Sequence, residues 1–343
     1  MDLQRTLGIE LPVIQAPMAG AQGSALAIAV CRAGGLGSLP AAMLDGDGLR
    51  REVAAVRAAT DRPFNVNFSC HQVVAPDSAR EAAWRQRLAP YYRELGLDPA
   101  AIPAAPVRTP FDAGAAAIVE ELRPAVVSFH LGVPAPALLA RVRATGATIL
   151  ASATTVAEAQ LLERAGVDAV IVQGLEAGGH RSHFLSDDLT LQSGLFALLP
   201  QVVAAVGIPV IATGGIADAA GVAGVRALGA AMAQVGTAYL LCPEATTRQP
   251  HRDALVSESA LHTKLTRLFS GGPARGIVNR LMRELDDSAD VPAFPHATTA
   301  IAPLRAAAEA RGSGDFSPLW CGQNASGCRA LPAGEVTRAL AAA

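Results

Sequence analysis

The chain has 343 residues, of which 51% are hydrophobic and 17% are charged, and its formal net charge at pH 7 is -2. This composition indicates a globular protein with a sizeable core, formed by one large barrel or by two ordinary domains. The absence of a basic excess argues against a nucleic-acid partner, and no uncharged apolar run reaches the roughly 18 residues of a membrane span. The five cysteines form no Cys-x-x-Cys pair, which argues against a disulfide framework and a zinc site. The N-terminal residues lack a basic region followed by an apolar segment, so we expect a cytoplasmic enzyme.

Short apolar segments alternate with Ala/Leu-rich helical segments along most of the chain. We expect eight strands, at residues 12–16, 36–39, 63–69, 125–130, 147–153, 168–174, 208–215 and 230–237. We expect the helices between them at residues 24–34, 47–59, 135–144, 155–166, 191–206 and 218–229. Strands that are apolar nearly throughout are typical of parallel strands buried on both faces. The pattern predicts an α/β fold of the (β/α)8 TIM-barrel type, and a doubly wound open sheet is the alternative.

Two regions interrupt this alternation. Residues 71–112 are rich in Pro, Arg and Tyr, and residues 241–314 are interpreted as several helices after the eighth strand. Since the first region follows the C-terminal end of a strand, we expect both to lie on the same side of the barrel. They would form a mainly helical cap or substrate domain over the catalytic face. The barrel would then comprise residues 1–70, 113–240 and 315–343, with GEVTRALAAA as its closing helix.

Two glycine loops carry a phosphate-binding signal. Gly214 and Gly215 follow the seventh strand, with Asp218 placed to cap the next helix, and Gly236 and Thr237 follow the eighth strand. Loops at these two places commonly bind phosphate in barrels, through backbone N–H groups and a helix N-terminus. One glycine pair alone is as readily a tight turn, but two such loops in this order favour phosphate binding.

The segment QGLEAGGH ends the sixth strand. Gly178 and Gly179 would let this loop lie close to a planar ligand. His180 would then point into the pocket, where an imidazole donates a hydrogen bond or exchanges a proton near neutral pH. His130, at the end of the fourth strand, is a second candidate. His183 lacks the glycine context, and we expect it at the surface or at a hinge.

Seven segments together resemble the nitronate monooxygenases (formerly 2-nitropropane dioxygenases), in particular the class I bacterial type: LPVIQAPMAG, NVNFS, EAGGHRSHF, PVIATGGIADAAGVAGVRALGA, QVGTAYLLCPEA, FSGGPARGIVNR and PLWCGQ. The resemblance covers nearly the whole chain in the correct order. It implies a capped barrel that binds FMN non-covalently, works in nitroalkane detoxification and is a monomer or homodimer. It also implies oxidation of alkyl nitronates, such as propionate 3-nitronate, by O2 to a carbonyl compound plus nitrite or nitrate.

The resemblance also implies roles for single residues. It places the family's catalytic histidine on His180, and its FMN contacts on Met18, Asn67, Gln173, Gly178, Gly215, Gln234, Val235, Gly236 and Thr237. Ala16, Pro17, Gly179 and Gly214 flank these positions and complete the expected cofactor site, which includes no metal. Three positions depart from the family pattern, where Gly272 replaces an Arg, Cys321 a small residue and His296 a Tyr. We expect His296 to line the substrate pocket.

Two other functions stay open at this point. Flavin reductases that use NADH to reduce quinones or enoyl thioesters would share the Gly-Gly-His loop and the phosphate loops. A non-redox barrel enzyme acting on a phosphorylated metabolite would share the phosphate loops alone. The aldolase version of the second alternative is disfavoured, because the sole lysine, Lys264, lies in the expected cap and not on a barrel strand.

Overall fold

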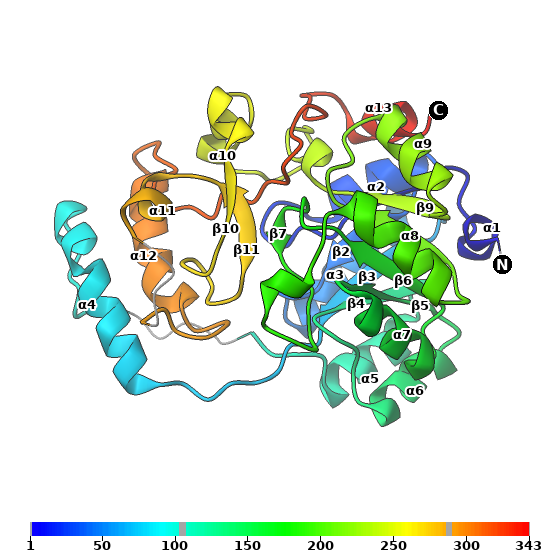
Figure 1. The fold of residues 1–343 in the computed structure, drawn as a ribbon, viewed down its shortest axis with the longest axis horizontal. Helices are drawn as coiled ribbons and strands as arrows, with labels where there is room; N and C mark the ends of the chain where they lie inside the picture. The colour runs from blue at the N-terminus through cyan, green and yellow to red at the C-terminus, as the bar shows by residue number, and fades with distance from the viewer. Residues whose placement is uncertain (1, 103–107, 286–289, 343) are drawn as a thin grey trace.

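The computed structural model describes residues 2–102, 108–285 and 290–342. The expected cap also includes residues 103–107 and 286–289, which lie outside the described residues. In Figure 1 a strand-and-helix barrel fills one part of the molecule, and a separate group of helices, α4, α11 and α12, lies at the opposite end.

Eight parallel strands form the barrel. They are β1 (Val13–Gln15), β2 (Gly37–Pro40), β3 (Phe64–Ser69), β4 (Val126–His130), β5 (Thr148–Ala153), β6 (Ala169–Gln173), β8 (Val210–Thr213) and β9 (Met232–Val235). Their order in the sheet is β1-β9-β8-β6-β5-β4-β3-β2, and a parallel bridge between Ile14 and Leu36 joins its two ends. The predicted TIM barrel is therefore confirmed, and the alternative of an open sheet is wrong.

Helices cover the outside of the barrel (Figure 1). They are α2 (Ser24–Arg32), α3 (Gly46–Ala59), α5 (Ala113–Leu122), α6 (Pro136–Ala144), α7 (Val156–Ala165), α8 (Leu195–Ala205) and α9 (Ala219–Ala227), with α1 (Leu3–Leu7) at the N-terminal end. Side-chain caps begin several of them: Asp218 accepts a hydrogen bond from the backbone N–H of Gly221, as predicted. The closing helix α13 (Ala333–Leu340) packs against α2 and α9.

The barrel core has two layers, because successive side chains of a strand point to opposite faces. One face of the strands packs inside the barrel, where the buried residues include Ile14, Leu36, Leu150, Ile171 and Met232. The other face packs against the helices and forms the largest hydrophobic cluster. Strands such as β6 are buried at every position, which is the physical reason for their nearly continuous apolar sequences.

A second hydrophobic core lies outside the barrel. It forms where α4 (Ser78–Glu94), α11 (Arg280–Glu284) and α12 (Thr298–Glu309) meet. Trp84 and Tyr92 of α4 are buried in it, and the Tyr92 hydroxyl donates a hydrogen bond to the Ala300 carbonyl oxygen at 2.7 Å. Segments about 200 residues apart in the sequence therefore share one core.

A three-stranded antiparallel sheet lies beside the barrel mouth. It has the order β10 (Thr263–Thr266), β11 (Ala274–Ile277) and β7 (Gly179–His180). The sequence interpretation of residues 241–314 as helices found α10 (Gln249–Leu255), α11 and α12 but missed this hairpin. Since β7 belongs to the loop after β6, the sheet joins that loop to the later part of the chain.

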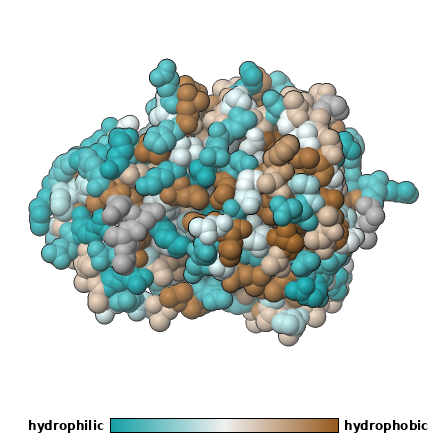
Figure 2. Space-filling model, viewed as in Figure 1, coloured by the Kyte–Doolittle hydropathy of each residue, from teal (hydrophilic) through white to brown (hydrophobic). Residues whose placement is uncertain are grey.

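The surface seen in Figure 2 mixes hydrophilic and hydrophobic residues, with hydrophilic side chains gathered at the end formed by α4. Within residues 2–102, 108–285 and 290–342, no helix is both long and apolar enough to cross a bilayer.

Candidate active site

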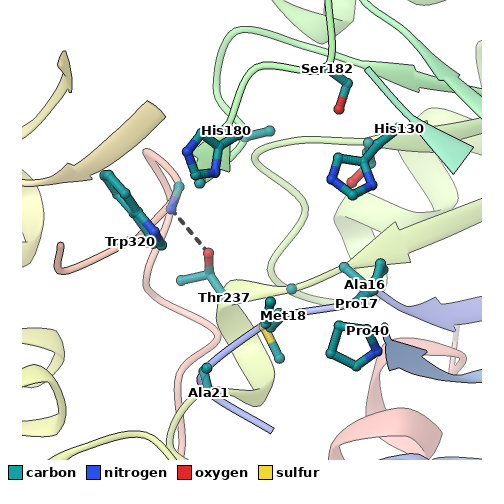
Figure 3. Close-up of a pocket in the computed structure, with 18 of the residues that line it drawn as sticks. Ala16, Pro17, Met18, Ala21, Pro40, His130, His180, Ser182, Thr237 and Trp320 are labelled. Atoms are coloured by element: carbon teal, nitrogen blue, oxygen red, sulfur yellow. Dashed lines mark hydrogen bonds between the residues drawn. The ribbon is translucent and has the colours of Figure 1, made fainter. Parts of the chain in front are cut away.

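A cavity of about 350 Å³ opens at the C-terminal ends of the barrel strands. Every residue that the sequence placed in the cofactor site lines it: Ala16, Pro17, Met18, Asn67, Gln173, Gly178, Gly179, Gly214, Gly215, Gln234, Val235, Gly236 and Thr237. His180 and His130 line it as well. Figure 3 shows His180 and Trp320 together on one side of the cavity, with His130 and Pro40 on another. The strand-end positions thus converge on one space, as expected of a barrel.

The two glycine loops present backbone donors to this cavity. Gly214 and Gly215 have φ angles of +123° and +70°, in the region that favours glycine. Among the described residues, the backbone N–H groups of Gly215 and Gly236 find no hydrogen-bond acceptor. The Thr237 hydroxyl accepts a hydrogen bond from the Gly322 N–H at 3.0 Å (Figure 3), which leaves its own proton to donate. Unpaired N–H groups at the cavity wall suit an anion such as phosphate.

Three side-chain amides lie at the cavity wall, and their hydrogen-bonding states differ. The Asn67 amide donates to the Ser128 hydroxyl at 2.9 Å. The Gln173 amide donates to the His180 carbonyl oxygen at 3.0 Å and accepts from the Ser182 N–H at 2.9 Å. The buried Gln234 Oε1 has no partner within the described part of the chain. Gln234 therefore offers an acceptor to a ligand, whereas Gln173 holds the backbone of His180 in place.

The loop that carries His180 is fixed by further contacts. Arg181 is buried, and its guanidinium donates to the carbonyl oxygens of Gly174 and Gln173 at 2.6 and 2.9 Å. A Cβ atom on Gly178 would lie 2.6 Å from the backbone carbonyl carbon of Cys321, so only glycine permits this close approach. The segment at residues 321–322 thus packs directly on the Gly-Gly-His loop. Cys321 is buried there, and its thiol donates to the Gly322 carbonyl oxygen.

His180 stands in an aromatic and polar environment. Its Nε2 lies 2.8 Å from the Ser270 hydroxyl oxygen, and its ring makes edge contacts with Phe294 and Trp320 at centroid distances of 5.2 and 5.6 Å. Its Nδ1 has no hydrogen-bond partner in the described ranges. Burial, followed by the positive charge of Arg108, lowers the pKa of His180 to about 3. The imidazole is therefore neutral near pH 7.

The remaining ionisable groups at the cavity are basic. Burial and the nearby Arg108 lower the pKa of His130 to about 4, so His130 is also neutral near pH 7. Arg108 and Arg305 supply positive charge, and no Asp or Glu is among the described residues that line the cavity. The described residues also contain no group of three or more His, Cys, Asp or Glu that could hold a metal ion. The electrostatic character of the cavity favours an anionic ligand.

Two expectations about histidines are wrong. His183 is only 9% exposed and lies 3.2 Å from Asp187 Oδ1, not at the surface. The reason is the buried Glu158, whose carboxylate accepts hydrogen bonds from the next two backbone N–H groups and draws this segment inward. His296 is absent from the cavity lining, and its Nε2 lies 2.8 Å from the Val74 carbonyl oxygen.

Sequence reasoning missed several residues around His180. Arg108, Ser270 and Trp320 line the cavity, and Phe294 contacts the His180 ring. Each lies in an irregular segment with no periodic pattern. The one signal that was available is the Gly-Gly-Pro turn at residues 271–273 between two short strands, which indicates a hairpin next to Ser270. Gly272 lies in this turn and would place a Cβ 3.2 Å from the Phe294 ring.

Comparisons with known proteins agree along the whole chain. A family model described as nitronate monooxygenase matches residues 2–342. A nitronate monooxygenase of Paraburkholderia phytofirmans is 43% identical over 97% of this chain and 92% of its own length. A nitronate monooxygenase of Pseudomonas aeruginosa is 42% identical over 98% of this chain and 97% of its own.

A solved structure shows the same fold. The crystal structure of nitroalkane oxidase from Streptomyces ansochromogenes superposes with a TM-score of 0.90 and 39% sequence identity. The match covers 100% of this chain and 97% of the other. The likeness therefore includes the barrel, the second core and the segment that packs on the Gly-Gly-His loop.

Proposed function

This chain belongs to the nitronate monooxygenase family, and we propose that it oxidises alkyl nitronates with O2, using FMN bound in the barrel cavity. The products are a carbonyl compound and nitrite or nitrate. The observation that carries the proposal is the placement of a neutral His180 in a cavity whose other walls present unpaired backbone donors.

The cavity walls fit FMN. The N–H groups of Gly215 and Gly236, with the Thr237 hydroxyl, would hold the phosphate. The free Gln234 Oε1 suits a ring N–H of the flavin, since a buried amide oxygen without a partner is costly. When bound, FMN supplies the electron-transfer chemistry, and the protein supplies binding, orientation and electrostatics.

His180 would hydrogen-bond the nitro group of the substrate and orient it. A proton on Nδ1 would be free to point at the substrate, since Nε2 is engaged by Ser270. With a pKa of about 3, the imidazole is a weak base, and a general base works best when its pKa lies near the working pH. His180 is therefore suited to a nitronate that is already deprotonated at carbon, and poorly suited to removing a proton from a neutral nitroalkane.

We further propose that one part of the chain binds FMN and another part faces the substrate. Residues 1–70, 113–240 and 315–343 would form the FMN-binding barrel, and residues 71–112 and 241–314 would form the cap that faces the substrate. The second hydrophobic core supports this division, because α4, α11 and α12 form a core of their own. Ser270 and Phe294 come from that part of the chain and contact His180.

Oxygen uptake by the flavin-loaded protein tests the proposal. Propionate 3-nitronate is supplied in one cell and NADH in a parallel cell, with boiled protein as the control. Fast uptake with the nitronate and none with NADH is the expected result. Flavin reduction by NADH without nitronate turnover would refute the proposal in favour of a reductase, and a protein that cannot be loaded with FMN would favour a non-redox barrel enzyme.

A further inference from the structure

Arg108 is a cavity residue that the function proposed above does not use. It lines the cavity with His180 and His130, and its charge acts on both, since it contributes to lowering the pKa of each histidine. Its position is anchored, because the Arg108 carbonyl oxygen lies 3.1 Å from His71 Nε2, whose other ring nitrogen lies 2.8 Å from the Ser69 hydroxyl. The residue is thus tied to the end of barrel strand β3.

The Arg108 guanidinium has no anionic partner in the part of the chain that the structure describes. Its one side-chain contact of note there is with the Phe294 ring, whose centroid lies 6.0 Å from the guanidinium carbon. The other cavity arginine differs, because Arg305 donates to the Glu309 carboxylate at 2.7 Å, a carboxylate that also pairs with Arg248. Among the described lining residues, Arg108 is therefore the arginine without a carboxylate partner, and His180 and His130 are neutral near pH 7.

Arg108 does not belong to the loops assigned to the FMN phosphate. The unpaired N–H groups for the phosphate belong to the loops after β8 and β9. Arg108 and His180 both contact Phe294, Arg108 over the ring and His180 at a centroid distance of 5.2 Å. The guanidinium of Arg108 and the imidazole that would hold the nitro group therefore contact the same aromatic ring. A substrate oriented by His180 would direct its other end toward this region.

We propose that Arg108 is a specificity-determining residue that binds a carboxylate carried by the nitronate substrate. A guanidinium presents a planar fork of donors that matches a carboxylate in a two-bond arrangement. The absence of acidic residues from the described lining leaves that fork available. This inference rests on the proposed function and adds a residue to it, one that would select nitronates with a carboxylate at the opposite end, such as propionate 3-nitronate.

The test compares two substrates of the same carbon count on the FMN-loaded enzyme. Propionate 3-nitronate carries the carboxylate, and propyl-1-nitronate lacks it. Arg108→Met removes both donors of the two-bond pairing with the carboxylate. Arg108→Met is therefore expected to lower kcat/KM for propionate 3-nitronate about 10- to 100-fold, mainly through KM, and to change that for propyl-1-nitronate less than about threefold. Arg108→Lys, which keeps the charge without the fork, should recover part of the loss.

Controls separate this inference from the proposed function. Arg93→Met removes the same charge from the exposed surface of α4 and should leave both substrates unchanged; Arg108→Gln replaces the Met variant if that variant fails to fold. An equal loss for both substrates, or no loss for either, would overturn the role of Arg108 while leaving the monooxygenase intact. Failure of the wild-type enzyme to oxidise either nitronate would instead refute the proposed function.

Discussion

The two sides of the cavity are built in different ways. One side, here called the barrel wall, consists of strand ends and their loops at residues 16–18, 67, 214–215 and 234–237. The other, the facing wall, consists of Arg108, His180, Ser270 and Trp320, with Phe294 packed against the His180 ring. These residues come from segments far apart in the sequence. The barrel wall offers backbone N–H groups and amides, whereas the facing wall offers aromatic rings, a hydroxyl and ionisable side chains.

Under the proposed function, this difference would separate cofactor binding from the reaction of the substrate. Backbone donors are fixed by the fold and are suited to holding a cofactor that every catalytic cycle uses. Side chains of irregular segments can change without altering the barrel, and they are suited to selecting a substrate. Changes on the facing wall should therefore alter turnover and leave FMN bound, and changes where the walls meet should alter stability.

The largest effect is expected from His180 on the facing wall. His180→Asn removes the imidazole beside Ser270, and kcat/KM for a nitronate should fall by at least about 100-fold, which is typical for loss of a positioned catalytic side chain. The FMN content of the purified variant should equal that of the wild type. Steady-state oxygen uptake and the flavin absorbance measure both quantities.

The control for this variant is His262→Asn, because His262 is exposed and outside the cavity lining. It should retain full activity. Full activity in His180→Asn would show that the histidine has no role in the reaction. Loss of flavin in that variant would show that the two walls do not separate cofactor binding from reaction.

The next effect is expected at the contact between the Gly-Gly-His loop and residues 321–322. Gly178→Ala would place a Cβ 2.6 Å from the backbone of Cys321. Moving backbone atoms in a packed interior to relieve this clash costs free energy. The free energy of unfolding should fall by about 1–3 kcal/mol, the usual cost of overpacking. Urea denaturation of the FMN-loaded protein measures it.

A matched glycine in the same chain serves as the control. Gly224 lies in α9, and a Cβ there would meet nothing within 4 Å. Gly224→Ala should leave stability unchanged or raise it by up to about 1 kcal/mol, because alanine favours helix. If Gly178→Ala were as stable as Gly224→Ala, the two segments would not be in the close contact described.

The effect that is smallest per residue is a pH dependence of stability. His180, His130 and His251 have pKa values lowered to about 3, 4 and 4, mainly by burial, whereas an unfolded histidine titrates near 6.5. Below about pH 6.5 the unfolded chain therefore binds more protons than the folded one, and stability falls as pH falls toward 4. We expect each of the three histidines to contribute a loss of about 1 kcal/mol per pH unit between pH 6.5 and 5.

Urea midpoints at pH 6.5 and 5 measure this loss. His130→Asn removes one of the three groups and should reduce the slope, whereas His262→Asn at the exposed position should not. A midpoint that stays constant or rises on acidification would contradict the burial of these imidazoles in neutral form.

The barrel wall was predictable from the sequence, and the facing wall was not. Strand ends converge at one mouth in any barrel, so Gly215, Gln234 and Gly236 could be grouped from the order of the strands alone. Ser270 and Phe294 could not be grouped in this way, because their segments have no hydrophobic periodicity from which the direction of a side chain can be predicted. The β10 strand illustrates the difficulty: its sequence TKLT holds one apolar residue, and its stability comes from pairing with β11.

Local context also misled the interpretation of single residues. His183 carries no glycine neighbours, and its burial depends on Glu158, which lies 25 positions earlier on helix α7. His296 departs from the family pattern, but its ring nitrogen Nε2 forms a hydrogen bond with the Val74 carbonyl oxygen and does not line the cavity. Gln173 lines the cavity as predicted, and its amide has a further role that the sequence did not indicate, because it bonds the His180 carbonyl oxygen and the Ser182 N–H. Such roles depend on long-range partners that a one-dimensional pattern does not contain.

A crystal structure of the FMN complex would test the division between the two walls most directly. The distances to measure run from the phosphate oxygens to the backbone nitrogens of Gly215 and Gly236. The account predicts hydrogen bonds of about 2.7–3.2 Å to both, with His180 and Arg108 free of the phosphate. A phosphate bound by Arg108, with the two glycine loops left without a ligand, would contradict it.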